Sequence, residues 1–347
     1  AEEANDDDTE EQASDVQAEE GRVRSASSGG VVVLDGLRKV FKRTRDEDTV
    51  GVRGVSFGVD HRECFGLLGP NGAGKSTVIG MLTGCLEPSG GSALVAGLDI
   101  RNAMTRIQAL VGMCPQRDML WGDLTPREHL LFYGRLKSLP RVQLQAAVEQ
   151  SLLAVRLTRV QDDKVATLSG GMQRRLSVAI SLIGSPVACY LDEPSTGLDP
   201  ASRRALWAAM RKAKSSRALL LTTHSMPEAE ALCDRLAIMV AGRLRCVGSP
   251  KELTRRLGGF HVVTVLCHAG MEAAVTAMLQ SLAPGTRVVH QLAGMHKYEV
   301  PSGQLALSEL FRAMSASRAS LGIKDWGVAN PTLEEAFVKV SRTALGL

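Results

Sequence analysis

Short apolar runs along this chain are separated by segments with a helical pattern of apolar positions. Residues 31–34 begin a strand, and residues 38–59 read as a pair of strands joined by the polar segment KRTRDED. Residues 125–159 have a helical pattern that starts at Thr125-Pro126. Strands buried on both faces are predicted at three apolar runs, 187–191, 218–223 and 235–240. Strands that alternate with helices predict a mostly parallel α/β sheet.

The pattern changes after about Gly258. The remaining residues predict the order strand, helix, strand, strand, helix, strand, followed by a last helix from Pro331. The two middle strands, at 286–292 and 297–300, pair across Ala293-Gly294. This order is typical of a ferredoxin-like unit. The sequence therefore predicts a first domain at residues 29–257 and a small α+β domain at residues 258–347.

The first 20 residues contain ten acidic side chains and no Lys or Arg. With almost no large apolar residue, this tail predicts a disordered acidic linker over residues 1–28. The chain begins with Ala rather than Met, so we expect a piece of a longer protein. The tail lacks the basic and apolar regions of a signal peptide, so we do not expect it to be one. The rest of the chain carries 41 basic and 27 acidic residues, a net charge of +14. That charge suits nucleic acid, an anionic membrane face or nucleotide phosphates, and does not choose among them.

The sequence predicts neither a membrane-spanning segment nor a framework of linked cysteines. The chain has no run of 18 or more apolar residues, so no membrane-spanning segment is predicted in it. The seven cysteines are scattered and form no CxxC pair. This usage predicts a reducing compartment, without a disulfide framework or a zinc site.

The segment GPNGAGKST fits the phosphate-loop pattern and lies between a predicted strand and a predicted helix within residues 64–84. Its glycines let the backbone amides approach phosphate oxygens, and the helix N-terminus adds a favourable dipole. Lys75 is predicted to reach the β and γ phosphates of ATP, and Ser76 to ligate Mg²⁺. The predicted ATP-binding residues of this loop are Gly69, Pro70, Asn71, Gly72, Ala73, Gly74, Lys75, Ser76 and Thr77.

The segment VACYLDEP places two carboxylates at the end of a buried strand. Asp192 stands where a phosphate-loop ATPase holds its metal ion, and Glu193 is a candidate general base for an attacking water. The alternative is a pair of surface acids at a strand end. Because the same chain contains a phosphate loop, we favour the catalytic interpretation of the two carboxylates.

The segment LSGGMQRR, residues 168–175, is a polar turn that leads into a helical pattern. Taken alone it predicts an ordinary N-capped surface helix. Arg174 and Arg175 either help to hold phosphate or a partner, or lie on the solvated face of that helix. The sequence slightly favours the solvated face.

Together these motifs resemble the nucleotide-binding domain of ATP-binding cassette (ABC) proteins. The glycine-rich loop, CPQ with Gln116, LSGGM, YLDEP, STGLDP and TTHS with His224 occur in the order and at the spacing of that family, over roughly residues 31–257. The resemblance implies a phosphate-loop ABC ATPase fold, with a mostly parallel sheet plus antiparallel β and helical subdomains.

In the ABC family two such domains face each other head to tail, with ATP between the phosphate loop of one and the LSGG turn of the other. The resemblance implies that Ser169, Gly170 and Gly171 bind the γ-phosphate on a second nucleotide-binding domain. Residues 197–200 would be the loop that passes between the two sites.

The resemblance also implies roles around the ATP of the same domain. Gln116 would ligate the metal, sense the γ-phosphate and take part in catalysis, and His224 would contact the γ-phosphate and hold the attacking water. Phe41 falls where the family has an aromatic ring that stacks on adenine. The alternatives are a core position for Phe41 and a structural role for His224.

Longer segments are similar to subfamily A of the ABC transporters, which is eukaryotic and mainly moves lipids. They include VGMCPQRDMLWGDLTPREHLLFYGRLKSLP and, in the small second domain, PTLEEAFVKV. This similarity implies an ATP- and Mg²⁺-dependent motor domain at the cytosolic face of a membrane, as part of a multi-pass membrane protein, with a regulatory domain after it. No nucleic-acid partner is expected.

Three alternatives are weighed against this interpretation. The first is the ATPase subunit of a bacterial-type drug or polysaccharide exporter, and the second is a soluble ABC ATPase that works on ribosomes or DNA. The third is an inactive nucleotide-binding scaffold, which the intact motif residues disfavour.

The residues after Gln116 are unusually apolar for a loop. Met119, Leu120 and Trp121 either line a groove that receives the transmembrane domains, or pack inside the helical subdomain. The sequence leaves both interpretations open.

Overall fold

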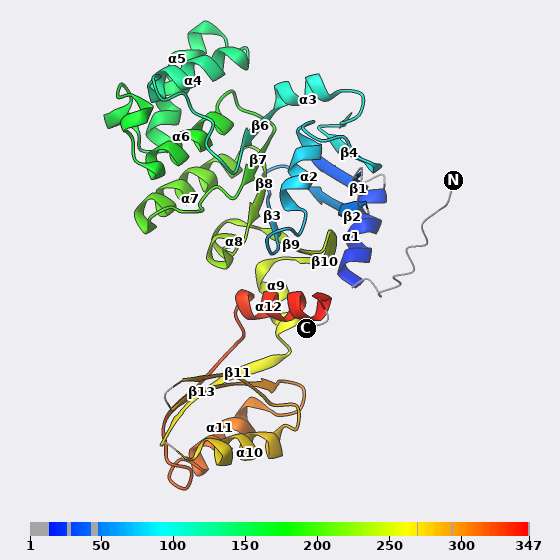
Figure 1. Ribbon diagram of the computed structural model, residues 1–347, viewed down its shortest axis with the longest axis vertical. Coiled ribbons are helices and arrows are strands. Elements are labelled where there is room, and N and C mark those ends of the chain that lie inside the picture. The colour runs from blue at the N-terminus through cyan, green and yellow to red at the C-terminus, as the bar shows by residue number, and fades with distance from the viewer. Residues whose placement is uncertain (1–13, 26–28, 43–47, 269, 293, 346–347) are drawn as a thin grey trace. The chain divides into compact units, whose positions relative to one another are not determined.

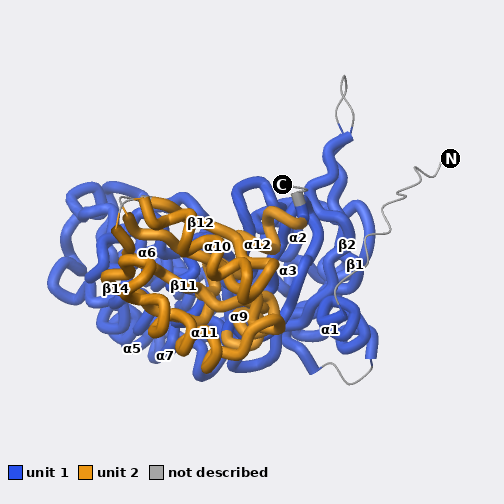
Figure 2. Tube along the Cα trace, turned by 90° about the horizontal axis from the view of Figure 1, so that it is seen from below, with its two compact units in different colours: residues 1–250, 344–347 blue, residues 251–343 orange. Residues whose placement is uncertain are grey.

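The computed structural model describes residues 14–25, 29–42, 48–268, 270–292 and 294–345. The chain forms two compact units, residues 1–250 with 344–347 and residues 251–343, which Figure 2 colours separately. The two units divide at 250/251, whereas the predicted boundary lies at 257/258. The helix α9 (Pro250–Gly258) therefore falls almost wholly in the second unit and not in the first. The two units are described one at a time.

A six-stranded sheet forms the centre of the first unit (Figure 1). Its strands, in spatial order, are β10 (Arg243–Gly248), β9 (Arg235–Val240), β3 (Cys64–Leu68), β8 (Ala218–Thr223), β7 (Ala188–Asp192) and β6 (Val111–Cys114). All neighbours pair in parallel except β10 with β9. Every residue of β7 and β8 is buried, as their apolar runs predict, and every residue of β3 is buried too. The predicted α/β fold with a mostly parallel sheet is confirmed.

An antiparallel sheet packs against the central sheet. Its strands, in spatial order, are β2 (Thr49–Val59), β1 (Val32–Phe41), β4 (Gly90–Val95) and β5 (Leu98–Asp99). The rings of Phe57 in β2 and Phe65 in β3 stack with centroids 4.7 Å apart. One hydrophobic core therefore joins the two sheets.

Helices cover the central sheet and form a separate helical subdomain. Next to the sheets lie α2 (Lys75–Leu82), α3 (Met104–Leu110), α7 (Pro200–Lys214) and α8 (Met226–Leu232). The helical subdomain contains α4 (Pro126–Leu136), α5 (Arg141–Ala154), two 3-10 turns, Thr158–Val160 and Val165–Thr167, and α6 (Gly170–Leu182), around a core of its own. The pattern over 125–159 thus gives two helices. Ser138 has φ 58° and Pro140 precedes α5, and both interrupt a continuous helix.

The second unit has the predicted ferredoxin-like order. After α9 come β11 (Phe260–Cys267), α10 (Glu272–Leu282), β12 (Arg287–Leu292), β13 (Met295–Pro301), α11 (Leu307–Ala316) and β14 (Ile323–Ala329), and α12 (Leu333–Leu345) follows. The antiparallel sheet has the order β12-β13-β11-β14, and it shares a core with α10 and α11. In neither unit does the described part of the chain contain a helix with the length and apolar character that crossing a bilayer needs.

The prediction of a disordered linker over residues 1–28 is wrong for α1 (Ser14–Arg24). This helix lies against β2 and β10, with Val16, Glu19 and Val23 buried on one face. The Glu19 carboxylate accepts hydrogen bonds from Arg22 at 2.8 Å and from Arg235 at 2.5 Å. Composition misled here because three residues at helical spacing are enough to dock a short helix. Residues 1–13 lie outside the described residues.

Glu19→Gln should lower the free energy of unfolding at pH 7 by about 2 kcal/mol, because it removes charge-assisted hydrogen bonds. Burial alone would raise the Glu19 pKa, but the bonds from Arg22 and Arg235 outweigh it and lower the pKa from 4.5 to about 2. The stabilisation is therefore present above the unfolded pKa of 4.5 and is lost as the pH falls toward 2. Urea unfolding at pH 7 and pH 3.5 should show a smaller difference between the two proteins at pH 3.5. Glu20→Gln is the control, and an equal loss in that variant would contradict the role of Glu19.

Candidate nucleotide site

A hollow of about 450 Å³ lies where β3 runs into α2. It brings together segments that are far apart in the sequence: Phe41, residues 49–51, residues 71–77, Gln116 and Glu193. Most of the predicted ATP-binding residues thus surround one space. Phe41 stands at its margin with 37% of its surface exposed, so the core alternative for Phe41 is not what the structure shows.

The loop that leads into α2 depends on its glycines. Gly72 and Gly74 have φ 80° and 104°, in the region that favours glycine. A Cβ on Gly69 would overlap the carbonyl oxygen of Met239 in β9. The backbone can therefore turn tightly beside the sheet and direct its amides into the hollow.

Lys75, the first residue of α2, is buried. Its ammonium donates hydrogen bonds to the carbonyl oxygens of Gly69, at 2.7 Å, and Pro70, at 3.0 Å. Burial lowers the Lys75 pKa below its ordinary value, and the Glu193 and Asp192 carboxylates oppose that shift. The cation is thus held among the loop and the two acids.

Parallel pairing brings the acidic pair to the same edge of the sheet as the phosphate loop. Asp192, the last residue of β7, lies beside Thr222 of β8, and the Thr222 hydroxyl donates to its carboxylate at 2.5 Å. The Glu193 amide donates to the Thr222 carbonyl and hydroxyl oxygens, both at 3.1 Å. Glu193 has φ 46°, a conformation that costs energy in a residue with a side chain. Thr222 therefore helps to hold a strained turn.

The Glu193 carboxylate is the point where the predicted catalytic residues meet. Its Oε2 accepts hydrogen bonds from the Gln116 amide at 3.2 Å and from the Thr196 hydroxyl at 3.3 Å, and its Oε1 lies 3.4 Å from His224 Nδ1. Glu193 is buried, whereas half of the His224 side chain is exposed. This arrangement fixes the orientation of a carboxylate that can accept a proton.

Oxygen ligands for a hard cation are present beside the hollow. Ser76 presents a hydroxyl there, and Asp192 presents a carboxylate at the end of β7. Hydroxyl, carboxylate and amide oxygens are the donors that Mg²⁺ prefers, so Ser76, Asp192 and Gln116 fit the predicted metal.

Ser169, Gly170 and Gly171 stand apart from this hollow, at the start of α6. The Ser169 hydroxyl caps the helix by accepting a hydrogen bond from the Met172 amide at 3.3 Å. Ser169 and Gly170 are exposed. The structure does not bring these residues to the phosphate loop of the same chain.

The favoured interpretation of Arg174 and Arg175 as a solvated helix face is wrong, because both are buried. The Arg175 guanidinium donates to the carbonyl oxygens of Val155 and Arg156 in the helical subdomain. Arg174 donates to the loop that follows β7.

Three further contributors to the site, two hydroxyl groups and one segment of strand β2, were not predicted from the sequence. Thr222 and Thr196 bind the acidic pair, and residues 49–51 line the hollow together with the phosphate loop. Thr222 and Thr196 lie within the TTHS and STGLDP motifs, whose presence predicted no role for these two hydroxyls.

Of the three residues Met119, Leu120 and Trp121, one packs inside the helical subdomain and two remain largely exposed. Leu120 packs against the core of the helical subdomain. Trp121 contacts the rings of His129, Phe132 and Tyr133 and still keeps 48% of its surface exposed, and Met119 is 74% exposed.

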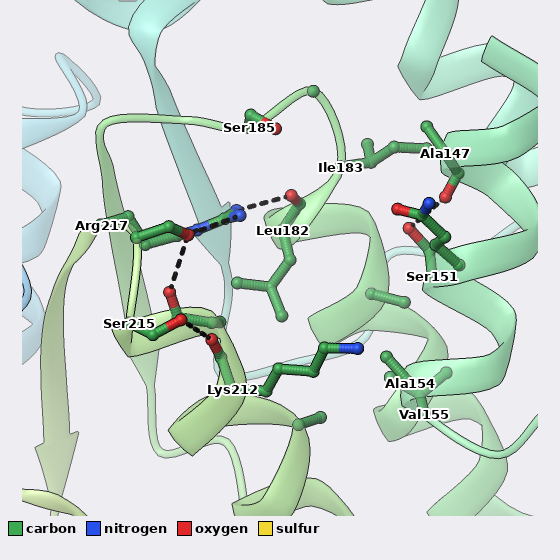
Figure 3. A pocket seen from close by; sticks show the side chains of 16 residues that line it. Ala147, Ser151, Ala154, Val155, Leu182, Ile183, Ser185, Lys212, Ser215 and Arg217 are labelled. Atoms are coloured by element: carbon green, nitrogen blue, oxygen red, sulfur yellow. Dashed lines mark hydrogen bonds between the residues drawn. The ribbon is translucent and has the colours of Figure 1, made fainter. Parts of the chain in front are cut away.

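A second hollow, of about 270 Å³, lies between α5, α6 and α7 (Figure 3). Lys212 and Arg217 border it, and none of the predicted site residues does. Arg217 donates to the carbonyl oxygen of Leu182 at 2.8 Å and so ties the end of α6 to the start of β8. The nucleotide motifs therefore point to the first hollow.

A phosphate loop, an acidic pair at the end of a parallel strand of the same sheet and a serine-capped helix on a separate helical subdomain define an ATPase of the ATP-binding cassette class. Residues 52–196 match the family model of the ABC transporter domain, and residues 258–330 match that of the ABCA1-like, C-terminal R1 regulatory domain. The chain belongs to the ABC transporter family, as an ABC-type ATPase domain followed by this regulatory domain.

The relatives and the solved structures agree with this assignment. The chain is 51% identical to ABC transporter A family member 5 and 50% identical to member 4 of Arabidopsis thaliana, in each case over 92% of this chain and 34% of the relative. It thus spans about a third of the length of the curated relatives it matches. An ATP binding subunit of an ABC transporter superposes with a TM-score of 0.59 at 28% identity, over 66% of this chain and 93% of that one. A dimeric ATP-binding cassette in a post-hydrolysis state, bound to ADP and Pi, superposes with a TM-score of 0.58 at 21% identity, over 63% and 98%, and shows the shared fold.

Gly74→Ala should destabilise the protein more than Gly72→Ala. Both residues have positive φ, which costs about 1 kcal/mol for alanine. A Cβ on Gly74 would also lie 2.5 Å from the Gly51 oxygen and 2.8 Å from Met239 Cε, whereas a Cβ on Gly72 meets open space. We expect Gly74→Ala to cost about 2 kcal/mol more, from urea unfolding at pH 7. Equal costs would show that the contacts of Gly74 do not constrain the loop.

Proposed function

We propose that this chain is the ATP-hydrolysing motor of a membrane transporter. The observation that carries the proposal is the placement of Glu193. Its carboxylate borders the same hollow as the phosphate loop, and Gln116, Thr196 and His224 all lie within 3.4 Å of it. Such an acid is suited to accept the proton of a water that attacks the γ-phosphate.

The remaining residues would bind and orient ATP. Residues 69–77 offer backbone amides and Lys75 to the phosphates, and Phe41 offers a ring face to adenine. Ser76, Asp192 and Gln116 would hold Mg²⁺, which supplies positive charge to the phosphate oxygens. His224, partly exposed beside Glu193, would hold the attacking water. Catalysis of this kind is mainly positioning and electrostatic stabilisation.

A second cassette would complete each site. Ser169, Gly170 and Gly171 form a helix N-terminus suited to an anion, and the exposure of Ser169 and Gly170 leaves this turn available to the ATP of a partner. The solved cassette that is a dimer bound to ADP and Pi supports this arrangement.

The transport role concerns the larger protein. Met119 and Trp121, which follow Gln116 along the chain, are exposed, as is Phe132, which contacts Trp121. The region Gln116–Trp121 would receive the transmembrane domains at the cytosolic face of a membrane. The boundary at 257/258, with residues 258–347 as a regulatory domain, belongs to this proposal. A lipid cargo is favoured because the relatives are A family members and the R1 domain accompanies the cassette. That accompanying domain disfavours an exporter ATPase of bacterial type and a soluble ABC ATPase.

Glu193→Gln should lower kcat for ATP hydrolysis at least ~100-fold, because the amide cannot accept the proton of the attacking water. Binding of a fluorescent ATP analogue should be retained, and ATP should trap a dimer in light scattering. Lys75→Ala should instead weaken nucleotide binding itself. Wild-type turnover by the Glu193→Gln variant would remove Glu193 from the base role.

Mixing two inactive variants tests the shared site. Lys75→Ala disables the phosphate loop, and Ser169→Arg places a cationic bulk in the LSGG turn. Each should lose ATPase activity alone. A mixture should recover activity, since a mixed dimer contains one intact loop facing one intact turn. Full activity of Ser169→Arg alone, or no recovery by a mixture shown to form dimers, would contradict the shared site.

A further inference from the structure

Arg174 lies in the second turn of α6, and only 5% of its side chain is exposed. Its guanidinium donates five hydrogen bonds, and just one of them reaches a charged partner, Asp118 at 2.9 Å. The other four go to backbone carbonyl oxygens. Burying a cation costs free energy, and here five hydrogen bonds compensate that cost. So complete a set of partners points to a specific role.

The partners of Arg174 belong to two separate segments. Nε donates to Pro194 O at 2.9 Å, and Nη2 donates to Asp192 O at 2.8 Å and Glu193 O at 3.0 Å. Nη1 donates to Pro115 O at 2.6 Å and to the Asp118 carboxylate. One side chain therefore joins α6 to the turn that carries Glu193 and to the segment that carries Gln116.

Resting on the proposed function, we propose that Arg174 is a positioning residue that couples the LSGG helix and the Gln116 segment to Glu193. The turn at Glu193 is strained, with φ 46°, and Arg174 holds the carbonyls on both sides of it. A shift of α6 or of residues 115–118 therefore moves the Glu193 carboxylate. At the other end of α6, Arg217 donates a hydrogen bond to Leu182 O (Figure 3). This bond ties the end of α6 to the start of β8 and so limits how far the helix can move relative to the central sheet.

The planar fork of arginine is essential to this role. A lysine ammonium has fewer donors and cannot reach carbonyls in three directions from one plane. Arg174→Lys thus keeps the charge and loses the coupling.

Arg175 provides a matched control in the same turn. It is also buried, and its bonds go to Gly171, Val155 and Arg156, all in the helical subdomain. Arg175→Lys should therefore loosen that subdomain without touching residues 115–118 or 192–194.

The test compares hydrogen exchange and kinetics of the full chain carrying Arg174→Lys or Arg175→Lys. In Arg174→Lys, amides of Glu193 and Thr196, which bond to Thr222 O and Glu193 O, should exchange about 10-fold faster. Peptides over 114–118 should also exchange faster. In Arg175→Lys, faster exchange should be confined to residues 155–171. Unchanged exchange at 193–196 in Arg174→Lys would overturn the inference.

Kinetics give a second readout. Arg174→Lys should lower kcat about 10- to 100-fold with nucleotide affinity retained, and the loss of kcat in Arg175→Lys should be markedly smaller. Asp118→Asn, a milder change at a partly exposed residue, should lower kcat severalfold even if Arg174→Lys fails to fold. Equal kcat in the two arginine variants, or wild-type kcat in Asp118→Asn, would overturn the coupling. Absence of ATPase activity in the wild type would refute the proposed function, and the exchange pattern would still decide the role of Arg174.

Discussion

The burial of charge at the carboxyl ends of β3, β7 and β8 is the constraint on which the cassette depends. Lys75, Asp192 and Glu193 are each less than a tenth exposed. A buried charge is costly unless opposite charges and hydrogen bonds compensate it. Here the lysine is close enough to the two acids for them to oppose its desolvation, and the acids bind Thr222, Gln116 and Thr196. The two acids therefore offset part of the cost of burying Lys75.

Parallel strand pairing is what makes this arrangement possible. The register that sets Leu68 beside Thr223 and Asp192 beside Thr222 brings three strand ends to one edge. The chain then leaves that edge through turns with positive φ, at Gly72 and Gly74 on one side and at Glu193 on the other. Glycine makes such a turn without strain, but Glu193 cannot. The turn at Glu193 therefore needs help from β8 and from α6, and it receives it from Thr222 and Arg174.

This difference explains which parts of the site could be predicted from the sequence. The phosphate loop is a local device, because strand, glycines and helix follow one another, so Gly69 to Thr77 can be identified from a short pattern. The acidic pair is local in the same sense. Arg174 binds residues 18 to 59 positions away, and no short pattern contains that information. The docking of α1 is equally non-local, since Glu19 bonds to Arg235, and its acidic composition predicts the opposite behaviour. The break between α4 and α5 was local, at Ser138 and Pro140, and could have been predicted.

The position of Arg174 on α6 has a consequence for the proposed dimer. Ser169 and Arg174 are five residues apart, so the LSGG turn and the guanidinium are separated by about 7 Å along one helix. In the head-to-tail arrangement, the N-terminus of α6 would contact the ATP of the partner, while the next turn binds the loop of Glu193 in its own chain. One short helix would then contact both active sites. A γ-phosphate bound at Ser169 would restrain α6, and through Arg174 it would restrain the Glu193 turn that serves the other ATP. Such a link gives the two sites a physical reason to act in concert.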